Sequence, residues 1–198
     1  MAKRLFDLLA AGLGLLLIAP LLLVVALVVR LDSPGPVFFR QERVGRHGRL
    51  FRIHKFRTMR VDAPSLGPAV TVGADPRITR AGRVLRHWRL DELPQFLDVL
   101  AGDMSLVGPR PEVPRYVAHY PEDLKARVLS VRPGLTDPAA LAYIDEATLL
   151  AGAADPEAVY VREILPRKLA AQVAYADRAT LATDVAVLWR TLRVLLGR

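Results

Sequence analysis

An uncharged apolar run near the N-terminus constrains this chain more than any other feature. Leu8 to Val29 carries no charge for about 22 positions, and a helix of that length is about 33 Å long. The hydrocarbon core of a bilayer is about 30 Å thick, so the run is nominally long enough to cross it. A cleaved signal peptide would be shorter and would end at a small-residue site, whereas this run ends at VVRLDSPGP. We therefore expect a membrane helix that stays in the chain.

Pro20 and the charges on both flanks favour a helix that enters the membrane and returns. A proline near the middle removes a helical hydrogen bond and bends the axis. Lys3 and Arg4 precede the run and Arg30 follows it, and basic residues tend to stay on the cytoplasmic side. Each arm, about 16 Å long, would reach only the middle of the bilayer. We predict a re-entrant helix over 1–32, broken at Pro20; a transmembrane helix with a tolerated proline is the alternative.

Charge and residue usage narrow the classes of partner and site. The 198 residues suit one domain with its own core. The net charge of +8 and the pI of about 10.4 favour anionic partners, namely nucleic acid, anionic lipid or phosphorylated metabolites. The absence of cysteine excludes disulfides and thiolate metal sites. The four histidines are scattered and form no zinc-binding pair.

Two β-rich stretches after the turn SPGP indicate a hairpin. VFFRQ and LFRIHKFRTM are separated by ERVGRHGR, whose glycines permit a reversal. From Arg30 to Arg60 there are eight arginines and one lysine against two acids. Such a basic surface beside a membrane segment would bind anionic headgroups. A solvated hairpin without that role is the alternative.

Helical segments occupy much of the remainder. ADPRITRAGRVLRHW predicts a helix with Asp75 as N-cap. Its arginines recur at every third position, as either a solvent-facing stripe or an anion-binding one. DELPQFLDVLAG predicts a second helix, with Pro94 in its first turn and Gly102 at its end. GDMSLVGPRPE and VRPGLTDP predict turns, ADPEAVYVREI predicts a short capped helix, and LPRKLAAQVAYADRA predicts a helix that restarts at Pro166.

The last segment, VAVLWRTLRVLLGR, has one apolar face. That face consists of Val185, Leu188, Trp189, Leu192 and Leu195, with the arginines set to the side. It suits a helix lying in the membrane interface with its tryptophan at headgroup level; a core helix is the alternative. The fold class that we expect is α+β and mostly helical, with a re-entrant helix, a β-hairpin and interfacial amphipathic helices. This describes a monotopic membrane protein.

Asp91 and Glu92 stand side by side at the expected start of a helix, directly after the arginine stripe. Helix capping alone would explain them and would contribute about 1–2 kcal/mol. The arginines and the membrane segment favour phosphoryl chemistry instead, because a carboxylate can attack phosphorus and form an acyl phosphate. A diphosphate would repel that carboxylate, so the site would need Mg²⁺ and arginines. One carboxylate would be the nucleophile while its neighbour holds the metal.

The chain resembles the monotopic phosphoglycosyl transferases, a family of bacterial sugar transferases. The resemblance runs almost end to end, and its most specific block extends from LDELPQ to GPRP. It is carried by KRLFDLL, GPVFFRQERVG, FRIHKFRTM, RVLRHWRLDELPQFLDVLAGDMSLVGPRPE, VRPGLT and YADRATLATD. It implies one domain over 1–198, with a re-entrant membrane helix over 1–32 and a cytoplasmic catalytic part over 33–198. It also implies the cytoplasmic face of the cell inner membrane as the location.

The resemblance further implies a two-step reaction. Asp91 would attack the sugar-linked phosphate of a UDP-sugar and release UMP, and undecaprenyl phosphate would then take the phosphosugar from the enzyme. Glu92 would act beside Asp91, and both are candidate ligands for Mg²⁺. The candidate substrate- or phosphate-binding residues are Arg86, Arg110, Arg132, Lys55 and Asp184; turn structure alone is the alternative for Arg110 and Arg132. Anionic membrane lipids and downstream glycosyltransferases are the further partners expected, and nucleic acid is not.

One stretch departs from the family. After RPGLT many members have Gly-Trp-Ala-Gln-Val-Asn-Gly-Arg, whereas this chain has DPAALAYIDEATLL. Contacts to the donor in 137–150 therefore cannot be carried over, Asp145 and Glu146 receive no role, and the sugar stays open.

Two other classes of function compete with an enzyme. A membrane-tethered nucleic-acid-binding protein would suit the net charge, but the chain has no recognisable reader motif. A non-catalytic membrane scaffold would explain the apolar run and the basic surface, but it leaves LDELPQ and GPRP without a reason.

Overall fold

The chain folds into a mostly helical structure with short strands, as expected for the α+β class. The computed structural model describes residues 2–66, 75–137, 150, 153 and 155–197. Its α-helices are α1 (Ala2–Asp32), α2 (Arg80–His87), α3 (Phe96–Ala101), α4 (Pro114–Val117), α5 (Glu122–Val128), α8 (Pro156–Val159), α9 (Leu165–Arg178) and α10 (Leu181–Leu196). Its tighter or wider turns are the 3₁₀ segments η1 (Arg46–Gly48), η2 (Ala63–Ser65) and η3 (Leu90–Gln95) and the π segment η4 (Tyr160–Ile164). Its strands are β1 (Phe38–Phe39), β2 (Glu42–Val44), β3 (Leu50–Arg52), β4 (Lys55–Phe56), β5 (Ser105–Val107) and β6 (Gly134–Thr136).

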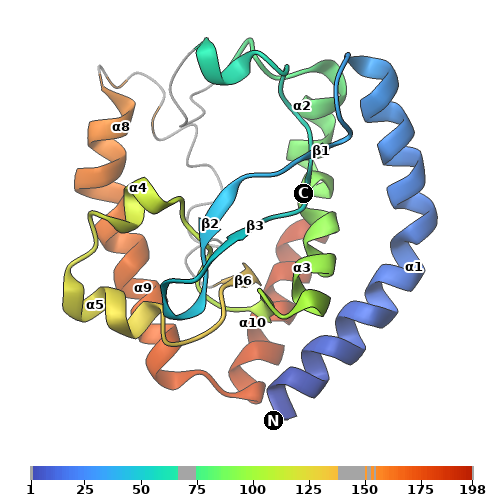
Figure 1. Cartoon of the computed structure of the whole chain (residues 1–198). Coiled ribbons are helices and arrows are strands. Elements are labelled where there is room, and N and C mark those ends of the chain that lie inside the picture. Colours follow the sequence, from blue (N-terminus) through green and yellow to red (C-terminus); the bar gives the residue numbers. More distant parts are fainter. Residues whose placement is uncertain (1, 67–74, 138–149, 151–152, 154, 198) are drawn as a thin grey trace.

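Helix α1 is continuous from Ala2 to Asp32, with Pro20 inside it. In Figure 1 it follows one side of the molecule and changes direction near its middle. A proline removes one hydrogen bond of a helix, and the flanking turns keep theirs, so the expected break at Pro20 is a bend within one helix. Among the described residues, α1 is the helix long and apolar enough to cross a membrane by length and composition, with a mean hydropathy of 2.9 over its most apolar window.

The start of α1 is fixed to the rest of the chain by polar side chains. Arg4 donates to the carbonyl of Val99 at 2.7 Å. The buried carboxylate of Asp7 accepts hydrogen bonds from the hydroxyl of Ser105 at 2.9 Å and from the backbone N–H of Leu106 at 3.2 Å. Charged residues in the first two turns of an apolar helix therefore serve as attachments to α3 and β5.

The end of α1 is fixed in the same way to a different part of the chain. Asp32 accepts a hydrogen bond from the backbone N–H of Ala81 at 3.0 Å, which satisfies a free donor in the first turn of α2. Arg57 donates to the carbonyl of Ser33 at 2.8 Å and to its hydroxyl at 2.6 Å. Arg57 is buried, so it is not part of the basic surface in which the sequence placed it.

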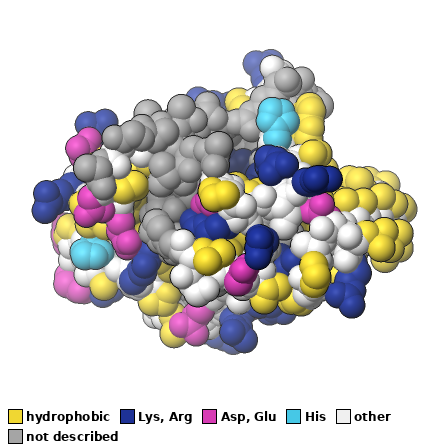
Figure 2. All heavy atoms as spheres, turned by 90° about the horizontal axis from the view of Figure 1, so that it is seen from above, with side chains coloured by type: hydrophobic (Ala, Val, Ile, Leu, Met, Phe, Trp, Pro, Cys, Tyr) yellow, Lys and Arg dark blue, Asp and Glu magenta, His cyan; other side chains and the backbone are white. Residues whose placement is uncertain are grey.

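Between these attachments, the apolar side chains of α1 are exposed. The most exposed include Leu16, Leu17 and Leu23, each 72–73% accessible. Hydrophobic side chains project from the edge of the molecule where α1 lies (Figure 2). The opposite face of the helix packs on α3, where the ring of Phe96 lies against Gly14.

The predicted hairpin is confirmed and includes more residues than expected. Strands β2 and β3 pair antiparallel, with Glu42 opposite Arg52, and β1 and β4 pair antiparallel, with Phe39 opposite Lys55. The residues ERV, expected in the loop, form β2. This register places Lys55 on a fixed strand beside η3.

Strands β5 and β6 form a parallel pair where the sequence predicted only turns. Ser105 lies opposite Gly134, and Val107 lies opposite Thr136. The backbones meet so closely that a Cβ on Gly134 would lie 2.0 Å from the backbone nitrogen of Gly108. Glycine is therefore required at this crossing, since any side chain would force the two strands apart.

Two predicted helix starts are corrected. Helix α2 begins at Arg80 with Thr79 as its N-cap, whose hydroxyl accepts from the N–H of Gly82 at 3.0 Å. Asp75 does not cap it, because its carboxylate instead binds the backbone N–H and the guanidinium of Arg77. The helix expected to restart at Pro166 in fact continues from α8 through the π segment η4 into α9.

Helix α10 divides its apolar residues between the core and the surface. Val187 and Leu188 pack into the cluster of buried residues beneath β5. Trp189 is 57% exposed, and Val185 and Leu192 are also exposed. The helix therefore combines features of both alternatives, a core helix and a helix with an exposed apolar face.

Candidate active site

Asp91 and Glu92 lie in the first turn of η3, which continues directly into α3. Both are buried, with 2% and 7% of their surface accessible. Arg89, immediately before this segment, has a φ of 56°, so the chain turns sharply into the helix. Pro94 follows inside η3, and Gly102 ends α3 with a φ of 93°. The predicted placement of the pair at the start of a helical segment is confirmed.

Lys55 of β4 lies between the two carboxylates. Its Nζ is 2.8 Å from Oδ2 of Asp91 and 3.3 Å from Oε1 of Glu92. An ammonium shared by two buried acids offsets part of the repulsion between them. Of the predicted phosphate-binding residues, Lys55 is thus one that the structure brings to the pair.

Glu92 is paired with three cationic side chains. Arg110 donates to both of its oxygens, with Nη1 at 3.2 Å from Oε2 and Nη2 on Oε1. Nη1 of Arg89 lies 3.6 Å from Oε2, and Lys55 is the third partner. Burial alone would raise the pKa of Glu92, but Arg110, Lys55 and Arg89 together hold that pKa well below its usual range. In return, the charge of Glu92 raises the pKa of Arg110. Glu92 is therefore ionised near neutral pH.

Asp91 has one oxygen without a partner. Oδ2 binds Lys55, whereas Oδ1 is buried and accepts no hydrogen bond. A buried polar atom left unpaired costs about 1–3 kcal/mol, so native proteins rarely keep one without a role. A carboxylate oxygen that is oriented by its twin and unpaired is suited to bind a cation or to attack an electrophile.

Arg86 of α2 is close enough to Asp91 and Glu92 to interact with their charges. Its Nε donates to the hydroxyl of Thr58 at 2.8 Å. Burial lowers the pKa of Arg86, while the negative charges of Asp91, Asp75 and Glu92 raise it. The arginine stripe that the sequence predicted thus splits: Arg80 and Arg83 are exposed, while Arg86 and Arg89 are partly buried beside the acids.

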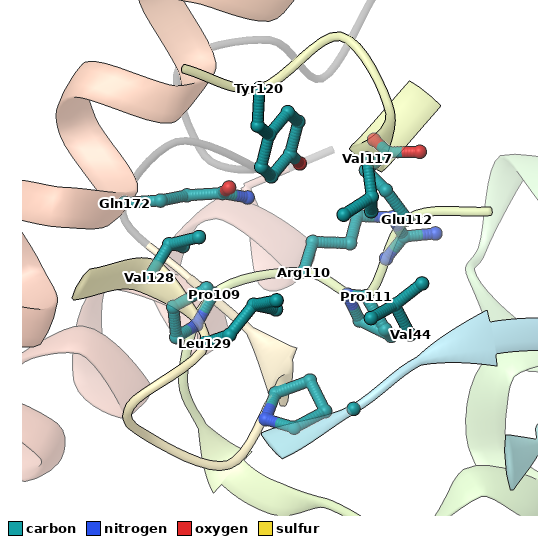
Figure 3. Close-up of a pocket in the computed structure, with 12 residues that line it drawn as sticks. Val44, Pro109, Arg110, Pro111, Glu112, Val117, Tyr120, Val128, Leu129 and Gln172 are labelled. Carbon is teal, nitrogen blue, oxygen red and sulfur yellow. The ribbon is translucent and has the colours of Figure 1, made fainter. Parts of the chain in front are cut away.

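Arg110 is held in turn by two residues, Asp137 and Gln172, for which the sequence predicts no role. Its backbone N–H donates to Oδ2 of Asp137 at 2.6 Å, and Nε2 of Gln172 donates to the same oxygen at 3.1 Å. Arg110, Gln172 and Tyr120 line a small pocket (Figure 3). The position of Asp137 directly after RPGLT was a signal for it, whereas Gln172 lies in a helix with no local indication.

A second group of charges lies next to this one. Glu112 accepts from the hydroxyl of Tyr160 at 2.6 Å and from Nζ of Lys168 at 3.4 Å. Burial would raise the pKa of Glu112, but Lys168, Arg43 and the hydrogen bond from Tyr160 lower it. These residues connect α9 to the segment that carries Arg110.

Two predicted site residues have partners outside the group around Asp91. Arg132 donates from Nε to the carbonyl of Gly102 at 2.9 Å, at the end of α3. Asp184 of α10 pairs with Lys3 and accepts from the hydroxyl of Tyr175 at 2.5 Å. Lys3 also donates to the carbonyl of Val107 at 3.1 Å. Both residues therefore join elements of the fold, and their predicted contacts with substrate stay predictions. Asp145 and Glu146 lie outside the described residues.

The donor set around Asp91 fits a magnesium ion that is shared with a substrate. No group of three or more His, Asp or Glu side chains placed to hold a metal is found in the described part of the chain. Mg²⁺ does not require one, because it usually keeps several waters and binds one or two carboxylates together with substrate phosphates. The unpaired Oδ1 of Asp91 is a donor of that kind.

Comparisons with known proteins agree on one family. The model of the bacterial sugar transferase family matches residues 1–198. A UDP-N-acetylgalactosamine-undecaprenyl-phosphate N-acetylgalactosaminephosphotransferase of Aeromonas hydrophila is 38% identical, over 98% of this chain and 43% of its own length. A UDP-glucose:undecaprenyl-phosphate glucose-1-phosphate transferase of Caulobacter vibrioides is 41% identical, over 98% of this chain and 69% of its own. An Escherichia coli protein of that same name is 45% identical, over 68% of this chain and 29% of its own.

Proposed function

The chain belongs to the bacterial sugar transferase family, and we propose that it transfers a sugar 1-phosphate from a UDP-sugar to undecaprenyl phosphate. The products are a polyprenyl-diphosphate sugar and UMP. The names of the relatives from Aeromonas, Caulobacter and Escherichia support both the donor class and the acceptor. The observation that carries the proposal is the buried, unpaired Oδ1 of Asp91 among basic side chains.

In the first step Oδ1 of Asp91 attacks the sugar-linked phosphorus of the donor. A new O–P bond forms, and the bond from that phosphorus to the bridging oxygen breaks, so that UMP leaves with the electron pair. Lys55 holds Oδ2 at 2.8 Å and thereby keeps Oδ1 directed at the substrate. In the second step an oxygen of undecaprenyl phosphate attacks the same phosphorus, and the carboxylate of Asp91 is released.

The basic side chains offset the charge of the diphosphate. Arg86, Arg89, Arg110 and Lys55 lie around the acid pair, and a carboxylate could not approach an anionic phosphate without such groups. Glu92 keeps Lys55, Arg89 and Arg110 near Asp91 through its own ion pairs. We propose this as the division of labour: Asp91 is the nucleophile, and Glu92 orders the cations.

Mg²⁺ is the proposed cofactor. Asp91 would hold it together with oxygens of the diphosphate, because its carboxylate keeps lone pairs beyond the one that binds Lys55, whereas both oxygens of Glu92 already bind Arg110. When bound, the ion would neutralise charge on the leaving UMP.

The attachments of α1 support a re-entrant rather than a spanning helix. Its first turns bind α3 and β5 through Arg4 and Asp7, and its last residue binds α2 through Asp32. A helix that crosses a membrane puts its ends on opposite sides, whereas here both ends contact one polar body. We propose that the exposed apolar middle of α1 enters the cytoplasmic leaflet of the inner membrane, with the exposed face of α10 in the interface. Exposed arginines of the hairpin, among them Arg40, Arg49 and Arg52, would bind anionic lipid headgroups.

The test is UMP release by detergent-purified protein. The protein is incubated with undecaprenyl phosphate and a panel of UDP-sugars, with Mg²⁺ or with EDTA. We expect UMP with at least one donor, no UMP with EDTA, and none with Asp91→Asn. In protein trapped with its donor before lipid is added, mass spectrometry should find a phosphosugar on Asp91. Release of UDP would indicate direct glycosyl transfer, and full activity of Asp91→Asn would reduce the pair to a helix cap.

A further inference from the structure

The buried carboxylate of Asp98, which is outside the acid pair, binds His54, the residue before Lys55. Oδ2 of Asp98 accepts a hydrogen bond from the backbone N–H of His54 at 2.8 Å, and Oδ1 lies 2.6 Å from Nδ1 of the same residue. Asp98 is 2% exposed. Both of its carboxylate oxygens thus bind one residue, and that residue directly precedes the lysine between Asp91 and Glu92.

The partners of His54 fix which ring nitrogen carries the proton. Nη1 of Arg40 lies 2.7 Å from Nε2 of His54, and a guanidinium can only donate. Nε2 therefore accepts, so Nδ1 carries the hydrogen and donates to Asp98. Arg40 is itself held by the carbonyl of Arg52 at 2.9 Å. The imidazole has one orientation that satisfies both neighbours.

Asp98 is itself held rigidly. Its carbonyl accepts hydrogen bonds from the N–H groups of Gly102, Asp103 and Met104, which close the end of α3. The neighbouring Val99 is fully buried. Asp98 can therefore act as a fixed point against which the strand is held.

The two contacts join the same two segments. Asp91 and Asp98 belong to one helical segment, η3 followed by α3, and His54 and Lys55 are consecutive in the hairpin. Lys55 binds the first part of the helical segment and His54 binds the second. Strand β4 is paired with β1 on its other side, and these two contacts, seven residues apart on the helical segment, fix the distance and the direction of the strand relative to η3 and α3.

We propose that Asp98 is a positioning residue, which acts through His54 to keep the ammonium of Lys55 on Asp91. This inference rests on the proposed function, because the position of Lys55 matters for activity only if Asp91 is the nucleophile. Asp98 does not touch the reacting atoms. Its effect is to keep Oδ2 of Asp91 occupied, so that Oδ1 is the oxygen left to react.

The experiment compares Asp98→Ala and Asp98→Asn with Asp7→Asn in the full chain. Asp7 is a matched control, since it is equally buried and also accepts two hydrogen bonds, but it binds Ser105 and Leu106 at the start of α1. The first measurement needs no substrate. Each protein is treated briefly with an amine-acylating reagent, and modification of Lys55 is followed by peptide mass spectrometry. Thermal unfolding of each variant is recorded alongside.

We expect Lys55 to react severalfold faster in Asp98→Ala than in the wild type, with an intermediate rate in Asp98→Asn, which keeps an acceptor for the N–H of His54. In Asp7→Asn the rate should equal that of the wild type. The rate of the phosphosugar-enzyme intermediate should fall on the order of 10- to 100-fold in Asp98→Ala, because a misplacement of about 1 Å has effects of this size.

Each outcome is decisive. Unchanged labelling of Lys55 in both Asp98 variants would overturn the positioning role. An equal rise of the Lys55 labelling rate in Asp7→Asn, when its thermal stability matches that of the Asp98 variants, would overturn it as well. If Asp98→Ala does not fold, the Asn variant and its labelling rate decide alone. A wild type that releases no UMP contradicts the proposed function, while the labelling result still tests the contact between Asp98 and the strand.

Discussion

Arg110 binds Glu92 with both ends of its guanidinium, Nη1 at 3.2 Å from Oε2 and Nη2 on Oε1. The backbone of the same arginine is bound by Asp137, which also accepts from Gln172. The GPRP turn is therefore held at its backbone from one side and binds an acid of the candidate active site on the other. A guanidinium can make this two-point contact, whereas a lysine makes a single-point one.

The first prediction contrasts two arginines of Gly- and Pro-rich turns. Arg110→Lys should lower the rate of intermediate formation at least tenfold and cost about 1.5–3 kcal/mol of stability, because one of two charge-assisted hydrogen bonds to Glu92 is lost. Arg132→Lys should cost about 0.5–1.5 kcal/mol of stability through the carbonyl of Gly102, with little change in rate. Single-turnover kinetics and denaturant unfolding measure both. Equal rate losses in the two variants would argue for a substrate contact of Arg132.

The second prediction concerns pH. The basic neighbours of Glu92 hold its pKa well below the ordinary value of 4.5, so the folded state releases this proton more readily than the unfolded state. The resulting stability is present in full above about pH 4.5 and is lost as the pH falls through the depressed pKa of the folded state. The wild type should thus lose more stability than Glu92→Gln as the pH falls below 4.5.

Unfolding midpoints measured from pH 6 downward check this, with Asp62→Asn as control. Asp62 also has a lowered pKa, set by its hydrogen bond from Arg60, but it is exposed and solvent weakens its contribution. Parallel curves for the wild type and Glu92→Gln would show that the ion pairs of Glu92 do not stabilise the fold.

Local patterns predicted the parts of the fold whose cause is local. The two β-rich stretches and the glycines between them predict the hairpin, and Gly102 predicts the end of α3. The parallel strands β5 and β6 could not be predicted, because strands of three residues within Gly- and Pro-rich sequence show no periodicity. The sequence predicts Asp75 as the N-cap, whereas in the structure Asp75 binds Arg77 and Thr79 caps α2.

In the candidate site, too, local sequence predicts some residues and long-range contacts determine the arrangement of the others. A short block predicts the acid pair Asp91 and Glu92, and the resemblance to the family adds Lys55, Arg86 and Arg110 as candidates. The structure places these three side chains near the pair. The neighbouring sequence does not determine which distant residue a charged side chain will bind. The sequence predicts a surface position for Arg57 and substrate contacts for Arg132 and Asp184, and it does not show that each of them also joins distant segments. The substrate contacts of Arg132 and Asp184 stay predictions. The arrangement as one domain over 1–198 stays a prediction.

The third prediction assigns a coupling to Lys3 and Asp184. Their ion pair joins the first turn of α1 to α10, and Tyr175 adds a hydrogen bond of 2.5 Å to the same carboxylate. Lys3→Met and Asp184→Asn should each lower stability by about 1–2 kcal/mol, and the double variant should lose clearly less than the sum. Denaturant unfolding in detergent gives the three values. Additive losses would mean that the two side chains act independently. If Asp184→Asn folds but forms no phosphosugar-enzyme intermediate, the predicted contact of Asp184 with the substrate is supported.

The last prediction concerns the side of the membrane on which the ends of α1 lie. The chain has no cysteine, so single cysteines can be introduced without background, at Ala2 before the apolar run and at Pro34 after it. Both positions are exposed.

Because Arg4 and Asp7 at one end and Asp32 at the other bind the same body, a membrane-impermeant thiol reagent should reach neither cysteine in intact cells. Both should react once the inner membrane is opened, as should a cysteine at Arg49, an exposed position of the hairpin that reports the side of the body. Labelling of Ala2→Cys alone in intact cells would mean that α1 spans the bilayer, and its contacts with α3 and β5 could not then exist in the membrane.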